Sequence, residues 1–96
     1  MKLNNRTNEE NRLAIISQWQ GKIVRHFKGD LYLIMDTNVI NTETNERMIY
    51  YKALYEQCRT FVKSANIFIE KCTEEQQRKY GQKYKFELYE IVSRKK

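Results

Sequence analysis

The apolar pattern of the chain changes at Gly21, and this change limits the folds that the chain can adopt. Before the glycine, residues 8–20 predict an amphipathic helix, because their apolar side chains fall on one arc of a helical wheel: Leu13, Ile15, Ile16 and Trp19. After it, short runs of β-branched and aromatic residues alternate with polar turn sequences. The helix is therefore expected to cover the sheet that follows it, because an apolar arc must be buried against another element.

The runs after Gly21 predict five or six short strands. The clearest of them lie at residues 23–27, 31–40, 48–55, 60–63 and 83–92, and residues 74–80 have helical character. Turn signals separate the first strands, namely Lys28-Gly29-Asp30 and the polar stretch 41–46, which is typical of a hairpin loop. Short strands in this number favour a small SH3-like antiparallel β-barrel, and an open α+β sheet covered by the helix is the alternative.

The length and charge of the chain limit its size class and its partners. Its 96 residues make one small domain, with the helix at about 8–20 and the β-barrel at about 21–92. The 18 basic and 12 acidic residues give a net charge of +6, which favours anionic partners. Two cysteines are too few for a disulfide scaffold, and no apolar run approaches the about 18 residues of a membrane span. We therefore expect a cytoplasmic domain without membrane contact.

Three short motifs follow one another in the chain: Arg25-His26-Phe27-Lys28-Gly29, Tyr51-Lys52-Ala53-Leu54-Tyr55 and Phe61-Val62-Lys63. With them, about residues 21–90 resemble a bacterial and phage family called domain of unknown function 1653. The resemblance implies a compact SH3-type β-barrel and brings no enzymatic activity with it. The family usually has arginine where this chain has Lys52 and Lys63. Lysine keeps the positive charge but lacks the planar, bidentate fork of arginine.

Six residues of these motifs are the candidates for binding an anionic ligand: Arg25, His26, Lys28, Tyr51, Lys52 and Lys63. A tyrosine beside a lysine or an arginine can hold a base or a nucleotide by stacking and charge together. The competing interpretation is structural. In that case most strand aromatics fill the core, and His26 forms a hydrogen bond near a turn.

The sequence lacks the motifs of catalysis and of metal binding. His26 is the only histidine, and the intervals of 32 residues to Cys58 and of 14 more to Cys72 match no zinc pattern. The three glycines stand alone at positions 21, 29 and 81, so no glycine-rich phosphate loop exists. We therefore expect no enzyme activity, no cofactor and no metal site.

The leading functional hypothesis is a non-catalytic binding module for a nucleotide-like small molecule or a nucleic acid, in a phage or mobile-element accessory protein. The alternative is a protein–protein interaction module or an inhibitor of a host protein. In the alternative, the N-terminal helix provides the interface, and a homo-oligomer would form through Leu13, Ile16 and Trp19.

Overall fold

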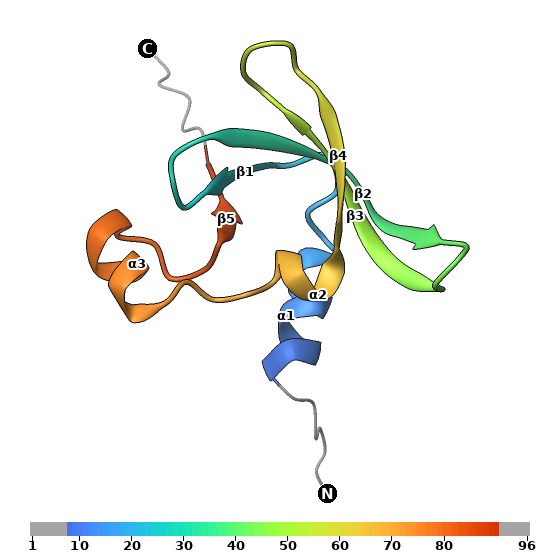
Figure 1. The fold of residues 1–96 in the computed structure, drawn as a ribbon, viewed down its shortest axis with the longest axis horizontal. Coiled ribbons are helices and arrows are strands. Elements are labelled where there is room, and N and C mark those ends of the chain that lie inside the picture. Colours follow the sequence, from blue (N-terminus) through green and yellow to red (C-terminus); the bar gives the residue numbers. More distant parts are fainter. Residues whose placement is uncertain (1–7, 91–96) are drawn as a thin grey trace, which may run out of the picture.

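A computed structural model describes residues 8–90 of the chain. Its centre is a five-stranded antiparallel sheet in the order β4-β3-β2-β1-β5 (Figure 1). The elements in chain order are α1 (Asn8–Ile16), β1 (Ile23–His26), β2 (Leu31–Asn41), β3 (Glu46–Ala53), β4 (Thr60–Ser64), α2 (Ala65–Phe68), α3 (Glu74–Tyr80) and β5 (Phe86–Leu88). The prediction of a mostly β fold with an N-terminal helix is confirmed.

The sheet is not closed into a barrel. Within residues 8–90, β4 and β5 form its two edges and do not pair with each other. A barrel requires its edge strands to be hydrogen-bonded, and here these strands are five and three residues long. Side chains join the two ends instead, because the ring of Phe68, at the end of α2, stacks on Phe86 of β5 with centroids 4.0 Å apart. An isolated bridge between Lys71 and Tyr84 adds to this junction.

The first helix ends earlier than its apolar pattern predicts. It stops at Ile16 instead of continuing to residue 20, because the chain tightens into turns. The amide of Gln18 donates to the carbonyl of Ile15 and that of Trp19 to Ile16, both over three residues instead of four. Gly21 follows with φ of 80°, a left-handed conformation that glycine adopts without strain. The last strand also covers less than the predicted 83–92, of which 91–92 lie outside the described residues.

The apolar arc of α1 packs into the chain's own core. Ile16 is 0% exposed and Trp19 is 5% exposed, and Leu13 packs against the same core from its rim. The core also contains side chains of the sheet and of α2, namely Val24, Ile34, Ile49, Tyr51, Ala65, Phe68, Ile69 and Phe86. The prediction that Leu13, Ile16 and Trp19 form an intermolecular interface is not supported here, because Ile16 and Trp19 are buried inside the chain and Leu13 is half-buried. The open sheet needs a cover, and the helix supplies it.

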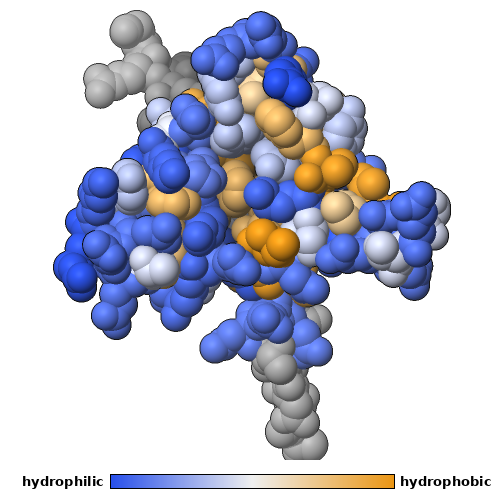
Figure 2. Space-filling view, viewed as in Figure 1, coloured by the Kyte–Doolittle hydropathy of each residue, from blue (hydrophilic) through white to orange (hydrophobic). Residues whose placement is uncertain are grey.

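Hydrophobic side chains on the surface are scattered. Figure 2 shows small, separate hydrophobic patches among hydrophilic atoms on the visible face. The most exposed large apolar residues, Val62, Ile15 and Ile67, come from three different elements or their ends. No helix in the described part of the chain is long and apolar enough to cross a membrane.

Two adjacent isoleucines of α1 provide a test of this packing. Ile16→Ala should lower the free energy of unfolding by about 2–5 kcal/mol, because it removes a fully buried side chain from the core. Ile15→Ala is the matched control, since Ile15 is 50% exposed, and it should change the stability by only about 0.5 kcal/mol. Urea unfolding followed by tryptophan fluorescence measures both. Equal losses in the two variants would contradict the assigned orientation of α1.

Candidate anion-binding site

The two faces of the sheet separate the predicted ligand-binding residues. Successive side chains of a strand point to opposite faces. Val24 and Ile49 are buried on what we call the inner face. His26 lies two residues after Val24 on the same strand, so it belongs to this face. Lys63 also belongs to it, because it is the cross-strand partner of Ile49. Arg25 is exposed and lies between Val24 and His26, on the outer face. Lys52 likewise lies on the outer face, because the residues on either side of it are buried. The structure therefore does not bring all six candidates together.

Tyr51 belongs to the core and is not a stacking platform. It is 6% exposed, and its ring meets those of Tyr32, Phe68 and Phe86 edge to face, with centroids 5.3–5.8 Å apart. The prediction that Tyr51 contacts a ligand is wrong in this fold, since a ligand would have to displace the core packing to reach the ring. Burial, with a smaller contribution from Tyr55, raises the pKa of Tyr51 to about 12.

The raised pKa of Tyr51 predicts a loss of stability in alkali. An unfolded tyrosine loses its proton near pH 10, whereas folded Tyr51 keeps it to about pH 12. Between these values deprotonation favours the unfolded chain, so the free energy of unfolding should fall by up to about 2–3 kcal/mol as the pH rises. Tyr51→Phe should remove the part of the slope due to Tyr51, while Tyr32, whose pKa is also raised by burial, keeps its own part. Tyr89→Phe, at an exposed site, should leave the slope unchanged. Denaturant unfolding from pH 9 to 11.5 measures the slopes, and equal slopes in both variants would contradict the assignment.

His26 is a half-buried ring held by contacts on two sides. Its ring centroid lies 4.4 Å from that of Phe27 and 5.0 Å from that of Phe86. Its Nδ1 accepts a hydrogen bond of 3.2 Å from the backbone amide of Lys28. A neutral imidazole carries one proton, so this bond assigns the proton to Nε2 and makes that atom a donor. The predicted hydrogen bond near a turn is present, and it leaves the other nitrogen for a ligand.

Three lysines lie near enough to His26 for their charges to act on it, and we call them the lysine cluster: Lys28, Lys63 and Lys85. Burial has the largest effect on the pKa of His26 and lowers it, and the positive charges of the three lysines lower it further. Asp30 is the acidic group that acts in the opposite direction. The cluster therefore joins a neutral N–H donor to three ammonium groups.

The members of the lysine cluster come from three distant parts of the chain. Lys28 lies in the turn after β1, Lys63 in β4, and Lys85 directly before β5. The ammonium groups of Lys28 and Lys85 lie 5.8 and 5.2 Å from the ring centroid of Phe27, so both flank one aromatic side chain. Lys85 was not among the predicted candidates. It lies between Tyr84 and Phe86, directly before β5, and only the pairing of β5 with β1 brings it near His26.

The pKa of His26 can be measured directly, because the chain contains one histidine. We expect an NMR titration of its ring protons, in a buffer without phosphate, to give a pKa below the ordinary histidine value of 6.5. A depressed pKa means that the unfolded chain binds the proton more readily, so stability is present above about pH 6.5 and falls as the pH decreases. A pKa at or above 6.5, or a stability that does not decline on acidification, would contradict this arrangement.

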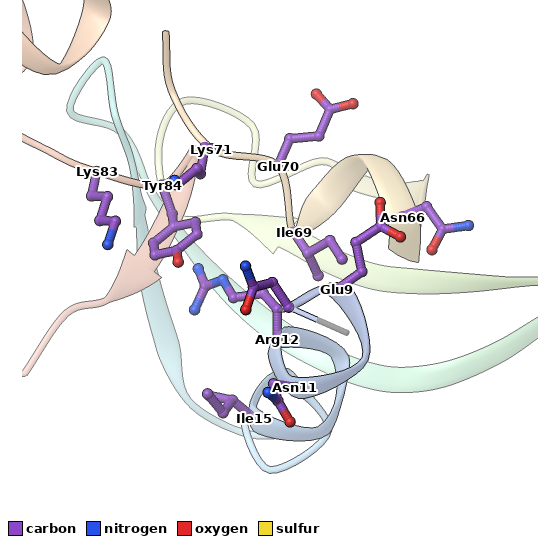
Figure 3. A pocket seen from close by; sticks show the side chains of 11 residues that line it. Glu9, Asn11, Arg12, Ile15, Asn66, Ile69, Glu70, Lys71, Lys83 and Tyr84 are labelled. Atoms are coloured by element: carbon purple, nitrogen blue, oxygen red, sulfur yellow. The ribbon is translucent and has the colours of Figure 1, made fainter. Parts of the chain in front are cut away.

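A second candidate site is a cavity of about 480 Å³ at the other end of the core. Figure 3 shows the side chains that line it, which come from α1, α2, the segment after α2 and the segment before β5. They are Asn8, Glu9, Asn11, Arg12, Ile15, Asn66, Ile69, Glu70, Lys71, Lys83 and Tyr84. None of them was predicted as a binding residue. Only the packing of α1 against the far end of the chain creates this cavity.

Arg12 is the central polar residue of the cavity. Its Nη2 donates to the carbonyl of Phe86 at 2.9 Å, and its guanidinium lies 3.7 Å from the ring centroid of Tyr84. Its Nε is buried and finds no acceptor within residues 8–90. Leaving such a donor unpaired costs about 1–3 kcal/mol or more. Burial lowers the pKa of Arg12, and nearby Tyr84 and Glu87 partly oppose this effect.

Neither site has the donor set of a metal centre. Within the part of the chain that the structure describes, no group of three or more histidine, cysteine, aspartate or glutamate residues could hold a metal ion. Both cysteines are free thiols, Cys58 on the surface and Cys72 in the interior.

The lysine cluster and most of the sheet lie in a stretch that matches a known family. Residues 22–87, which are 66 of the 96 residues, match the model of the family described as "Protein of unknown function (DUF1653)". The chain therefore belongs to this family. The match contains the whole lysine cluster and excludes α1 with Arg12. No curated protein and no solved structure matches the chain significantly.

Proposed function

We propose that this member of the DUF1653 family is a non-catalytic module that binds the phosphate groups of a nucleotide or a nucleic acid at the lysine cluster. The observation that carries the proposal is that Lys28 and Lys85 lie 5.8 and 5.2 Å from the ring centroid of Phe27, next to His26, and that their charges and that of Lys63 act on His26. The three positive charges would attract an anion to this place, and Asp30 is the acidic group that acts on His26 against them.

The chemistry of the cluster suits phosphate. Lysine binds phosphate oxygens as a compact point charge and needs no planar, bidentate geometry. His26 adds a neutral Nε2–H donor at neutral pH, because its pKa is lowered. The loss of the family's usual arginine at position 63 is therefore tolerable for a phosphate ligand, whereas a planar carboxylate would be held less well.

Charge, and not base stacking, supports this binding mode. Tyr51 lies in the core, and the hydroxyl of Tyr32 is hydrogen-bonded to that of Tyr55 at 2.9 Å. Phe61 is the partly exposed aromatic residue beside Lys63 on the inner face. Binding should therefore weaken steeply as salt is added, since exposed charges are screened and counterions compete for phosphate.

Two double variants of equal charge test the proposal. Lys28→Gln with Lys63→Gln changes the cluster, and Arg25→Gln with Lys52→Gln removes the same charge from the outer face. The first should weaken the binding of labelled single-stranded DNA or of ATP about tenfold, or ~1.4 kcal/mol, measured by fluorescence anisotropy at low salt. The second should change it less than about twofold. Equal losses in both would show that only net charge matters, and no detectable binding of either probe would remove the proposal.

A second readout reports on the site itself. A phosphate ligand at the cluster opposes the lysine charges, so it should raise the pKa of His26 measured by NMR. Nucleotide and DNA can be compared in separate titrations, which also distinguishes a small-molecule ligand from a nucleic acid.

The alternative function has lost its predicted surface. A protein–protein interface or a homo-oligomer through α1 requires Ile16 and Trp19 outside the core, where they are not found. An accessory role in a phage or mobile element and a cytoplasmic location rest on the family's occurrence and on the chain's composition, and both stay proposals.

We further propose that the open sheet is a variant of the SH3-type barrel. The stack of Phe68 on Phe86 and the bridge between Lys71 and Tyr84 support this view, because both draw the two edges together. An experimental structure with backbone hydrogen bonds between residues 60–64 and 86–88 would establish closure, and edges held apart would exclude it.

A further inference from the structure

We propose that the cavity beside α1 binds a small organic carboxylate with an apolar body, and that Arg12 is the group that holds the carboxylate. This inference is independent of the phosphate site proposed above. It uses other residues, and only some of them lie within the family match.

The cavity has the size of a small-molecule site. Its volume of about 480 Å³ falls within the about 300–1,000 Å³ of ligand pockets. Ile15, Ile69 and the ring of Tyr84 contribute apolar surface to its lining (Figure 3). The other lining residues are polar or charged, and Arg12 lies among them.

Arg12 is fixed in position but is not saturated. The carbonyl of Phe86 and the ring of Tyr84 hold the guanidinium in place. The buried Nε–H still has no acceptor within residues 8–90. That atom has no accessible surface, so a ligand in the cavity would meet the other N–H groups of the guanidinium, for which a carboxylate oxygen is a strong acceptor.

The protein's own carboxylates do not fill this role. Glu87 is the acid that acts electrostatically on Arg12, but its Oε2 already accepts the backbone amides of Lys83 and Tyr84 at 3.1 and 3.0 Å. In Figure 3 the carboxylates of Glu9 and Glu70, which line the cavity, lie on the side away from the guanidinium.

The acidic residues around the cavity disfavour a multiply charged anion. Arg12, Lys71 and Lys83 contribute three positive charges to the lining, and Glu9 and Glu70 contribute two negative charges. Glu87, which acts on Arg12, balances the remaining positive charge, so the preference for a carboxylate rests on the guanidinium and not on net charge. A ligand with several phosphate groups would meet the repulsion of both glutamates, so this cavity and the lysine cluster should prefer different anions.

Three isosteric probes test the charge preference on the full chain. Benzoate, benzamide and benzamidine share one ring and carry a negative, a neutral and a positive head group. In two-dimensional ¹H–¹⁵N NMR, benzoate should shift the amides of Ile15, Ile69 and Tyr84 in a saturable manner. Benzamide should bind at least about tenfold more weakly, and benzamidine should leave these amides unchanged. Equal binding of benzoate and benzamide, or no saturable shift with benzoate, would overturn the proposal.

Variants assign the effect to the arginine. Arg12→Lys keeps the charge but removes the Nε–H donor and the planar fork, so it should weaken benzoate binding at least about fivefold. Lys28→Gln with Lys63→Gln should leave benzoate binding unchanged, although it weakens phosphate binding in the proposal above. If Arg12→Lys does not fold, the comparison of the three probes on the unmodified chain still tests whether the cavity prefers a carboxylate. Benzoate binding that is unaffected by Arg12→Lys, or that shifts the amides of the lysine cluster instead, would overturn the assignment.

Discussion

The stack of Phe86 on Phe68 is the contact on which the rest of the structure depends. An open sheet with short edge strands has no ladder of hydrogen bonds between its ends, so side chains must join them. Phe86 also meets the rings of Tyr32, Tyr51 and His26 and accepts a hydrogen bond from Arg12 through its carbonyl. One residue of the last strand therefore positions the core, the histidine of the lysine cluster and the arginine of the cavity.

The two proposed sites differ in the anion that each would prefer. The lysine cluster places ammonium groups near a neutral histidine, which would suit a multiply charged phosphate. The cavity holds one oriented guanidinium beside apolar side chains and two glutamates, which would suit a single carboxylate. The first site lies inside the family match, and the second depends on a helix outside it.

Sequence patterns predicted the strands well, because alternation and turn chemistry are local properties. The runs at 23–27, 31–40 and 60–63 agree with β1, β2 and β4 to within one residue at either end. The sites were less predictable, since they depend on which distant segments meet. His26 and Lys63 share a face because of the register that links β1 to β4 through β2 and β3, and the burial of Arg12 follows from the docking of α1. On a helical wheel Arg12 looks like part of a solvated face, and nothing local indicates that Tyr84 will cover it.

The bond from Arg12 to the carbonyl of Phe86 couples recognition to folding. The same side chain that we propose to hold a carboxylate also ties the first helix to the last strand, 74 residues away. A substitution of Arg12 that changed the preferred ligand would therefore also remove a hydrogen bond that holds β5. Substitutions at Arg12 should therefore be accompanied by compensating substitutions in β5.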